Sequence, residues 1–368
     1  MNLDLRLSFP QPPIRSRVRL ERGSLDALGD LTARCTHATQ AVLVTDSHVG
    51  PLYGARAERS LKRAGLRVTR VQIPAGERAK SELHLSGLWR AFAAAGLTRS
   101  GVVVALGGGV VGDLAGFAAA TWLRGLPWVG VPTSLLAQVD SSVGGKTAID
   151  LREGKNLVGA FHQPAGVLVD PDTLATLPAR HVRAGLAEVI KTGMAVDAAL
   201  FRWCEAHADE LAQGDPQALA GAVVRSIRAK ARVVSADERE REGGGRTALN
   251  LGHTLGHALE SALGYRGLLH GEAVAIGLRV AAALSVREAG LPIGSRVRLE
   301  AMLDHVGLPV RMPPVRVSAL LSTMQRDKKR SAAAVRWVLT PSIGAASVPR
   351  AVKSTFVRAA LQELGARG

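Results

Sequence analysis

Short apolar segments alternate with amphipathic segments over the first half of the chain. The apolar segments are rich in β-branched residues and too short for helices, so each predicts a buried strand. They cover residues 41–44, 66–73, 102–106, 128–131 and 167–169. Helical periodicity occupies residues 52–64, 81–95 and 110–121. This alternation predicts a parallel sheet with helices on both faces, to which residues 17–20 could add one more strand.

The pattern changes after Pro178, where helical periodicity takes over. The expected helices cover residues 184–194, 198–212, 216–235, 247–263, 270–288, 293–306, 317–326 and 352–364. We therefore expect an α/β domain over residues 1–178 and an all-helical domain over residues 179–368. A chain of 368 residues is long enough for two such domains.

Polar or glycine residues come just after several of the expected strands, at Asp46, Glu77, Gly107 and Thr133. The carboxyl ends of parallel strands meet at one edge of a sheet, and ligands bind beyond that edge. We therefore expect these four residues to lie together. Thr133 could also cap a helix that begins there.

Three glycines, Gly107 to Gly109, connect the central strand to the next helix. Glycines let a phosphate approach the backbone, and a helix N-terminus presents unpaired N–H groups and the positive end of a dipole. Gly107, Gly109 and Gly112 fit the pattern G-x-G-x-x-G, although the acidic residue expected about twenty positions later is absent. The turn predicts a phosphate site, and the alternative is a plain tight turn between strand and helix.

The following segment is crowded with polar groups between two apolar stretches. They are Gln138, Asp140, Ser141, Ser142, Lys146, Thr147, Lys155 and Asn156. Gly144 and Gly145 would let the backbone come close to a ligand. This density of hydrogen-bonding groups favours a site for a polar, anionic small molecule, and an exposed loop is the alternative.

Three histidines lie within eighteen residues of the helical half. His253 and His257 are four residues apart and so share one helix face, on which Asn250 also lies. His270 starts the next expected helix, close to Glu272. Two of these histidines and a carboxylate would suit zinc with an open catalytic position, and the spacing alone favours the pair His253 and His257. The alternative is a structural role for each histidine.

A mostly apolar helix places Glu188 and Lys191 three residues apart on one face. Its apolar flanks indicate burial, which favours a functional pair over a surface ion pair. Farther along, Lys230 and Arg246 stand out from a highly charged segment that otherwise reads as a solvated face. The charged run RDKKR at residues 326–330 is expected to be a solvated loop.

Composition limits the partners and the location that the protein can have. The net charge of +16 suggests nucleic acid as a partner, but the basic residues are spread along the chain and only 4% of residues are aromatic, so we expect none. No apolar run reaches 18 residues, the N-terminus lacks signal-peptide features, and Cys35 and Cys204 form no metal or disulfide pattern. We therefore expect a cytoplasmic protein that does not enter a membrane.

Lysine is the rare basic residue here, since only nine of the 47 basic residues are lysines. Seven of them lie in polar or glycine-bearing stretches: Lys80, Lys146, Lys155, Lys191, Lys230, Lys328 and Lys329. A chain that uses arginine by default is expected to retain lysine where a compact ammonium group is needed.

With these residues in view, the sequence resembles the 3-dehydroquinate synthase family of sugar phosphate cyclases from about Asp46 to beyond Lys329. The matching strings, in chain order, are GGGVVGDLAGF, RGLPWVGVPTSLLAQVDSSVGGKTAID, GKNLVGAFHQP, LAEVIK, NLGHTLGHALE, LHGEAVAIG and RDKK. So many ordered matches are very improbable by chance.

The resemblance implies a Rossmann-like N-terminal domain that binds NAD, a helical C-terminal domain that binds zinc or cobalt, and a homodimer. The implied metal ligands are Glu188, His253 and His270, with His257 as a polar group of the active site instead of a ligand. The implied NAD contacts are Asp46, Gly76, Glu77, Lys80, Gly108, Gly109, Val110, Val111, Gly112, Asp113, Thr133, Ser134, Lys146, Lys155, Thr173 and Thr176. The implied substrate and catalytic contacts are Arg124, Asp140, Lys146, Asn156, Lys191, Lys230, Arg246, Asn250, His257 and Lys328, with Lys329 as an alternative to Lys328.

The reaction implied by the resemblance converts 3-deoxy-D-arabino-heptulosonate 7-phosphate into 3-dehydroquinate and phosphate. Transient oxidation by NAD, phosphate elimination, reduction and an aldol closure follow one another, so NAD acts as a catalyst. Two alternatives stay open: a cyclase for another sugar phosphate, of the 2-deoxy-scyllo-inosose or valiolone synthase type, and a metal-dependent polyol dehydrogenase. Arg246, Asn250 and His257 favour the dehydroquinate enzyme over the other cyclases, and the lysines argue against a simple dehydrogenase.

Overall fold

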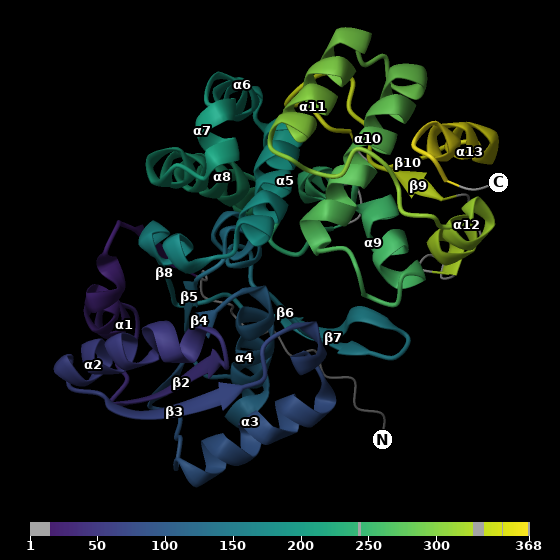
Figure 1. The fold of residues 1–368 in the computed structure, drawn as a ribbon. Helices are drawn as coiled ribbons and strands as arrows, with labels where there is room; N and C mark the ends of the chain where they lie inside the picture. The colour runs from purple at the N-terminus through teal and green to yellow at the C-terminus, as the bar shows by residue number, and fades with distance from the viewer. Residues whose placement is uncertain (1–14, 242–243, 327–334, 348, 367–368) are drawn as a thin grey trace, which may run out of the picture.

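Six parallel strands form the sheet of the N-terminal half, in the order β1-β8-β5-β4-β2-β3 (Figure 1). They are β1 (Arg17–Leu20), β2 (Gln40–Asp46), β3 (Arg67–Ile73), β4 (Gly101–Gly107), β5 (Trp128–Pro132) and β8 (Gly166–Val169). The computed structural model describes residues 15–241, 244–326, 335–347 and 349–366. All residues of β4 are buried, as expected of a continuous apolar run in the interior of a parallel sheet. Each strand expected from the apolar pattern is confirmed.

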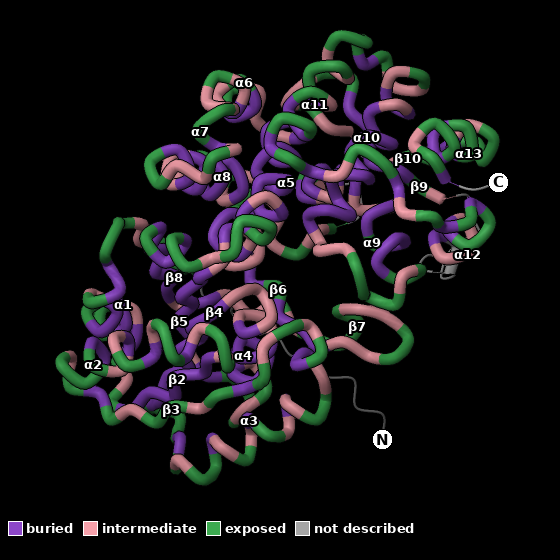
Figure 2. The backbone as a smooth tube through the Cα atoms, in the orientation of Figure 1, coloured by how far each residue is buried: buried purple, intermediate pink, exposed green. Residues whose placement is uncertain are grey.

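Two hydrophobic cores cover the faces of this sheet. The helices are α1 (Leu28–Cys35), α2 (Ala55–Arg63), α3 (Glu82–Ala94) and α4 (Gly109–Thr121). Val102, Val104 and Leu106 of β4 face the core with α1 and α2, whereas Val103 and Ala105 face the core with α3 and α4. The alternation follows from the pleat of a strand. The expected helices on both faces are confirmed, and Figure 2 shows the buried backbone along β4 and β5.

The carboxyl ends of β2, β4 and β5 lie side by side. The register pairs Gly107 of β4 with Pro132 of β5 and places the end of β2 beside them, and the Thr133 N–H donates to the Gly107 carbonyl at 3.0 Å. The shared edge is therefore confirmed for the residues that follow these strands. The expected cap is wrong in detail, because Ser134 Oγ, and not Thr133, accepts from the Ala137 N–H at 3.3 Å.

A β-hairpin occupies much of the polar segment, where no strand was expected. β6 (Lys146–Leu151) pairs antiparallel with β7 (Gly154–Phe161). The hairpin projects from the N-terminal half towards α9 (His253–Ala262) of the C-terminal half (Figure 1). It therefore brings the polar segment to the boundary between the two halves.

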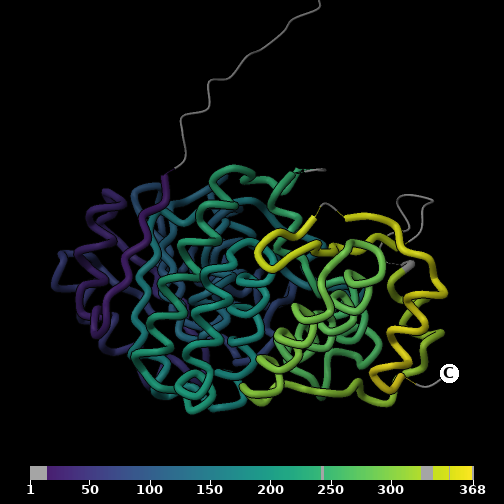
Figure 3. Tube along the Cα trace, turned by 90° about the horizontal axis from the view of Figure 1, so that it is seen from above, coloured from purple at the N-terminus to yellow at the C-terminus, as the bar shows by residue number. Residues whose placement is uncertain are grey.

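The C-terminal half is mostly helical and lies beside the sheet domain (Figure 3). Its other helices are α5 (Ala179–Val196), α6 (Ala198–Ala206), α7 (Ala208–Gln213), α8 (Pro216–Ala236), α10 (His270–Glu288), α11 (Ile293–His305), α12 (Val317–Arg326) and α13 (Ser354–Glu363). Helices α5 and α10 are buried over most of their length. None of the helices described is both long and apolar enough to span a membrane.

Three expectations for this half need correction. It is not all-helical, because β9 (Arg336–Trp337) and β10 (Arg350–Ala351) form a short antiparallel pair. The helix expected at residues 198–212 breaks at His207 into α6 and α7. Asn250 ends a 3-10 turn, Gly245–Asn250, and so precedes α9 instead of lying on its histidine face.

Candidate active site

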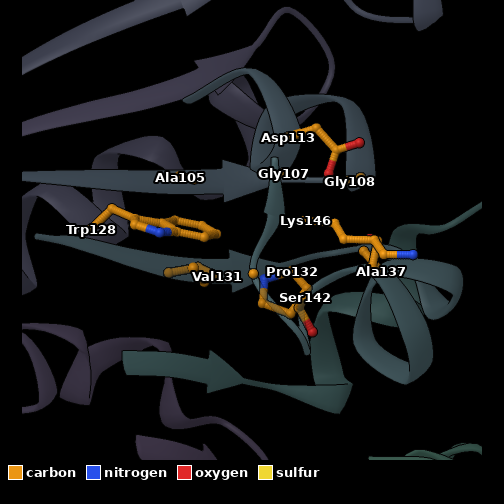
Figure 4. Close-up of a pocket in the computed structure, with 15 residues that line it drawn as sticks. Ala105, Gly107, Gly108, Asp113, Trp128, Val131, Pro132, Ala137, Ser142 and Lys146 are labelled. Carbon is orange, nitrogen blue, oxygen red and sulfur yellow. The ribbon is translucent and has the colours of Figure 1, made fainter. Parts of the chain in front are cut away.

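A pocket opens at the turn between β4 and α4 (Figure 4). Its lining comes from the glycine turn, the first turn of α4, the end of β5 and the start of the hairpin. It includes Gly107, Gly108, Gly109, Asp113, Pro132, Ser142, Gly145 and Lys146. Among the described residues no side chain caps the N-terminus of α4, so its first N–H groups can bind an anion. The geometry supports the predicted phosphate turn.

A buried lysine ties Asp113 of α4 to the hairpin. Lys80 Nζ donates to Asp113 Oδ2 at 2.8 Å and also to the Asn156 side-chain oxygen. Burial opposes the charge of Lys80, but the nearby carboxylates of Asp113 and Glu77 outweigh it and raise the pKa of this lysine. Lys155 lies 3.1 Å from Glu77 Oε1. Residues expected to contact NAD therefore form one charged network at the sheet edge.

The other residues assigned to NAD lie in turns beyond the strands or at the start of α4. The Asp46 carboxylate accepts two backbone N–H bonds from the next turn, both at 2.8 Å. Gly76 has a φ of 97°, which favours glycine. Thr173 is buried and its hydroxyl donates to a backbone carbonyl at 2.7 Å, while Thr176 shares a 2.7 Å hydrogen bond with Tyr53. Direct contacts of these residues with NAD stay predictions.

Two buried lysines hold Asp140. Lys230 Nζ donates to Asp140 Oδ1 at 2.7 Å and to its carbonyl at 2.6 Å. Lys191 Nζ lies 3.7 Å from Asp140 Oδ1 and 2.6 Å from Glu188 Oε2. Burial alone would raise the pKa of Asp140, but the charges of Lys191 and Lys230 lower it far below its usual range. The aspartate is therefore ionised and joins the polar segment to the metal-ligand candidates.

Buried Glu188 of α5 lies beside the histidines of α9 and α10. Its Oε1 lies 3.7 Å from Nε2 of both His253 and His270, and ligand atoms of all three histidines lie within 4.8 Å of one another. Glu188 Oε2 lies 2.6 Å from Lys191 Nζ, its ion-pair partner, whereas Oε1 accepts no hydrogen bond from a described residue. Burial and the charge of Lys191 hold the pKa of His253 well below its usual value. A buried carboxylate beside the imidazoles of His253 and His270 fits zinc or cobalt.

Close backbone contacts bring together the three helices that carry this cluster. A Cβ atom at Gly271 of α10 would lie 1.8 Å from the carbonyl oxygen of Ala184 on α5. At Gly277 of α10 it would lie 1.9 Å from the carbonyl oxygen of Gly252, directly before α9. Only glycine permits such approaches, so these two positions determine how near α5 and α9 come to α10.

Alanine variants separate the metal ligands from their neighbour. We expect His270→Ala to lose bound zinc, because its Nε2 faces Glu188, whereas His257→Ala should retain zinc because His257 is the exposed member of the cluster. Elemental analysis of the purified variants measures the difference. Loss from His257→Ala together with retention by His270→Ala would show that the pair favoured by spacing, His253 and His257, binds the metal.

Lys146 faces a carboxylate that follows α8. Glu240 contacts both Lys146 Nζ and the side-chain amide of Asn250. Its φ of 50° is unusual for a residue other than glycine. Glu240 thus lies where an anion would reach Lys146 and Asn250. The sequence offers no signal for it, because a glutamate in a run of charged residues is typical of a solvated face.

Arg246 is buried against the backbone of the polar segment. Its Nη2 donates to the Gly144 carbonyl at 3.1 Å and its Nη1 contacts the Glu238 carbonyl. A Cβ atom at Gly144 would lie 2.5 Å from that Nη2 atom. The guanidinium is therefore at the site, and its expected bond to a substrate carboxylate stays a prediction.

Two of the expected substrate contacts are not found at this site among the described residues. Arg124 is exposed at the end of α4 that lies opposite the glycine turn, and the 13 residues of α4 span roughly 20 Å. Its substrate contact stays a prediction. Lys328 and Lys329 lie outside the described residues.

Comparison with known proteins identifies two adjoining family matches in the chain. Residues 70–184 match the family described as 3-dehydroquinate synthase N-terminal, and residues 185–330 match 3-dehydroquinate synthase C-terminal. The 3-dehydroquinate synthase of Bordetella pertussis is 48% identical over 345 residues, which cover 94% of this chain and 95% of that protein. The chain belongs to the 3-dehydroquinate synthase family. The resemblance drawn from the motifs is thus confirmed.

Solved structures of sugar phosphate cyclases share the fold of this 3-dehydroquinate synthase family member. The 2-epi-5-epi-valiolone synthase from Streptomyces hygroscopicus, with NAD⁺ and Zn²⁺ bound, is 29% identical with a TM-score of 0.88, covering 98% of this chain and 99% of that one. A 2-deoxy-scyllo-inosose synthase complexed with carbaglucose-6-phosphate, NAD⁺ and Co²⁺ is 26% identical with a TM-score of 0.85, covering 94% and 96%. The predicted Rossmann-like domain is confirmed, and the domain that follows it is mostly helical instead of all-helical.

Proposed function

We propose that this chain is a 3-dehydroquinate synthase, a phosphorus–oxygen lyase that converts 3-deoxy-D-arabino-heptulosonate 7-phosphate into 3-dehydroquinate and phosphate. One observation carries the proposal: five lysines with carboxylate partners lie between a phosphate turn of the sheet domain and a carboxylate–histidine cluster of the C-terminal half. The 48% identity to the Bordetella pertussis enzyme supports this choice of substrate.

NAD and zinc or cobalt are the proposed cofactors, as in the two cyclase structures. Bound together, they would supply a reversible hydride acceptor and a Lewis acid for neighbouring hydroxyls of the substrate. Glu188, His253 and His270 would hold the metal. The turn at Gly108–Asp113, with Lys80 and Lys155 at its side, would hold the dinucleotide.

The chain's own charges then position the substrate. Lys146 lies at the rim of the dinucleotide turn, where it would hold the substrate phosphate as a point charge. Lys191 and Lys230 hold Asp140 ionised beside the metal ligands, which orients its carboxylate towards substrate hydroxyls. Burial lowers the pKa of Lys230, whereas nearby carboxylates raise the pKa of Lys191 despite its burial.

A cyclase of the valiolone or 2-deoxy-scyllo-inosose type is the alternative supported by the solved structures. It shares the cofactors and the fold, so only the substrate distinguishes it. Turnover of the heptulosonate phosphate, with no turnover of glucose 6-phosphate or other sugar phosphates, would exclude this alternative. We also propose a cytoplasmic homodimer, and light scattering of the purified chain measures its mass.

We expect phosphate release from the heptulosonate phosphate to need NAD only in catalytic amounts. The reaction is redox-neutral overall, so the cofactor ends each cycle in the state in which it began. Phosphate and NADH are followed together while NAD⁺ is limiting. Turnover that stops after one product per NAD⁺ would contradict the proposed function and favour a simple dehydrogenase.

A further inference from the structure

Glu260 on α9 is a buried carboxylate for which the reaction outlined above has no role. Its Oε2 lies 3.0 Å from His270 Nδ1 and its Oε1 lies 3.0 Å from Lys155 Nζ. It is only 5% exposed. The side chain therefore bridges a proposed metal ligand and a lysine of the dinucleotide edge.

The contact with Glu260 fixes the tautomer of His270. A carboxylate can only accept a hydrogen bond, so Nδ1 must carry the proton and donate it. In the neutral ring the lone pair of His270 then lies on Nε2, the atom that is 3.7 Å from Glu188 Oε1. A carboxylate behind a metal-binding imidazole orients the ring and makes it a stronger ligand.

The second oxygen of Glu260 connects this centre to the sheet domain. Lys155 belongs to β7 of the hairpin and lies between two carboxylates, 3.0 Å from Glu260 and 3.1 Å from Glu77. Glu77 follows β3 at the carboxyl edge of the sheet. An unbroken chain of contacts therefore runs from Glu77 through Lys155 and Glu260 to His270, across both halves of the molecule.

We propose that Glu260 is a positioning residue that couples dinucleotide binding at the sheet edge to metal binding by His270. This inference rests on the proposed function, because it takes the NAD and metal assignments as given. The phosphates of a bound dinucleotide attract the Lys155 ammonium and weaken its ion pair with Glu260. The Glu260 carboxylate then interacts more strongly with His270. NAD should therefore strengthen metal binding, and the metal should strengthen NAD binding by the same factor.

Cobalt affinity of the metal-free chain tests this coupling without any turnover. It is measured by competition with a coloured chelator, with and without NAD⁺. We expect Glu260→Gln to weaken cobalt binding without NAD⁺ by about 10- to 100-fold. NAD⁺ should tighten cobalt binding by the wild type about fivefold or more, and in Lys155→Met this gain should fall to nearly none.

Asp304→Asn is the matched control. Asp304 pairs with Arg279 of α10, the helix that starts with His270, so this variant removes an ion pair from the same helix without touching the ligand. Wild-type affinity in Glu260→Gln, or an equal loss in Asp304→Asn, would overturn the coupling. A wild-type chain that binds no cobalt at all would instead contradict the proposed function. Thermal unfolding of each variant confirms that the chain is folded.

Discussion

Glu188→Gln is expected to remove the bound metal and to lower kcat/KM by on the order of 1,000-fold or more. A metal Lewis acid is worth several kcal/mol of transition-state stabilisation, and each 1.36 kcal/mol is tenfold in rate. The amide keeps the shape of the side chain but loses the charge that faces His253 and His270 at 3.7 Å. Metal content and steady-state kinetics measure the two effects.

A stability measurement separates metal loss from misfolding. Lys191 is 1% exposed and loses one of two carboxylate partners in this variant, so some destabilisation is expected, below the roughly 3–5 kcal/mol of a fully broken buried pair. NAD binding at the sheet edge should persist. Glu272→Gln is the control, because Glu272 lies close to His270 in α10 but pairs with Arg180. Metal retained by Glu188→Gln and lost by Glu272→Gln would refute the ligand assignment.

Lys146→Met is expected to lose about tenfold to a hundredfold in kcat/KM. A charge-assisted hydrogen bond is worth roughly 1.5–3 kcal/mol, and phosphate is bound before elimination and expelled during it. The contact should therefore matter in the transition state as well as in the ground state, lowering kcat and weakening binding together. Lys146→Arg should not restore full activity, because a planar fork does not replace a compact ammonium.

The ion pair of Lys146 with Glu240 suggests a different role, in which Lys146 only anchors the hairpin to the loop after α8. Glu240→Gln breaks the same pair and leaves the lysine in place. If Lys146 is an anchor, both variants should lose thermal stability alike, and Lys146→Met should bind phosphorylated and phosphate-free analogues equally worse. Selective loss of the phosphorylated analogue supports the phosphate assignment.

The hydrophobic pattern predicts the core elements well because burial determines them. β4 and α10 follow continuous apolar or periodic runs, and the bounds of α10 are as expected. The hairpin was not predictable in this way, since β7 is exposed along much of its length and its pattern resembles a loop. The start of α9 was misplaced because a 3-10 turn carries part of the same periodicity.

Lysine usage was the best predictor of the site. Lys80, Lys146, Lys155, Lys191 and Lys230 all have carboxylate partners around the proposed NAD, phosphate and metal sites. The roles of Glu240 and Glu260 were not predictable, because they depend on a loop conformation and on contacts between distant segments. Spacing along one helix likewise predicted that His257 lies beside His253. It could not predict that Glu188 lies near them, since that carboxylate is on another helix.

The glycines of α10 have a consequence for how far relatives can diverge. At Gly271 the separation of α5 and α10 is set by backbone meeting backbone, with 1.8 Å between a hypothetical Cβ and the Ala184 carbonyl oxygen. Substitutions of the surrounding aliphatic side chains can then alter core volume without changing the distance between the two helices. Such substitutions therefore do not change the distance between Glu188 and His270. Relatives that keep these glycines can therefore differ in many core side chains and still keep the same distance between the two helices.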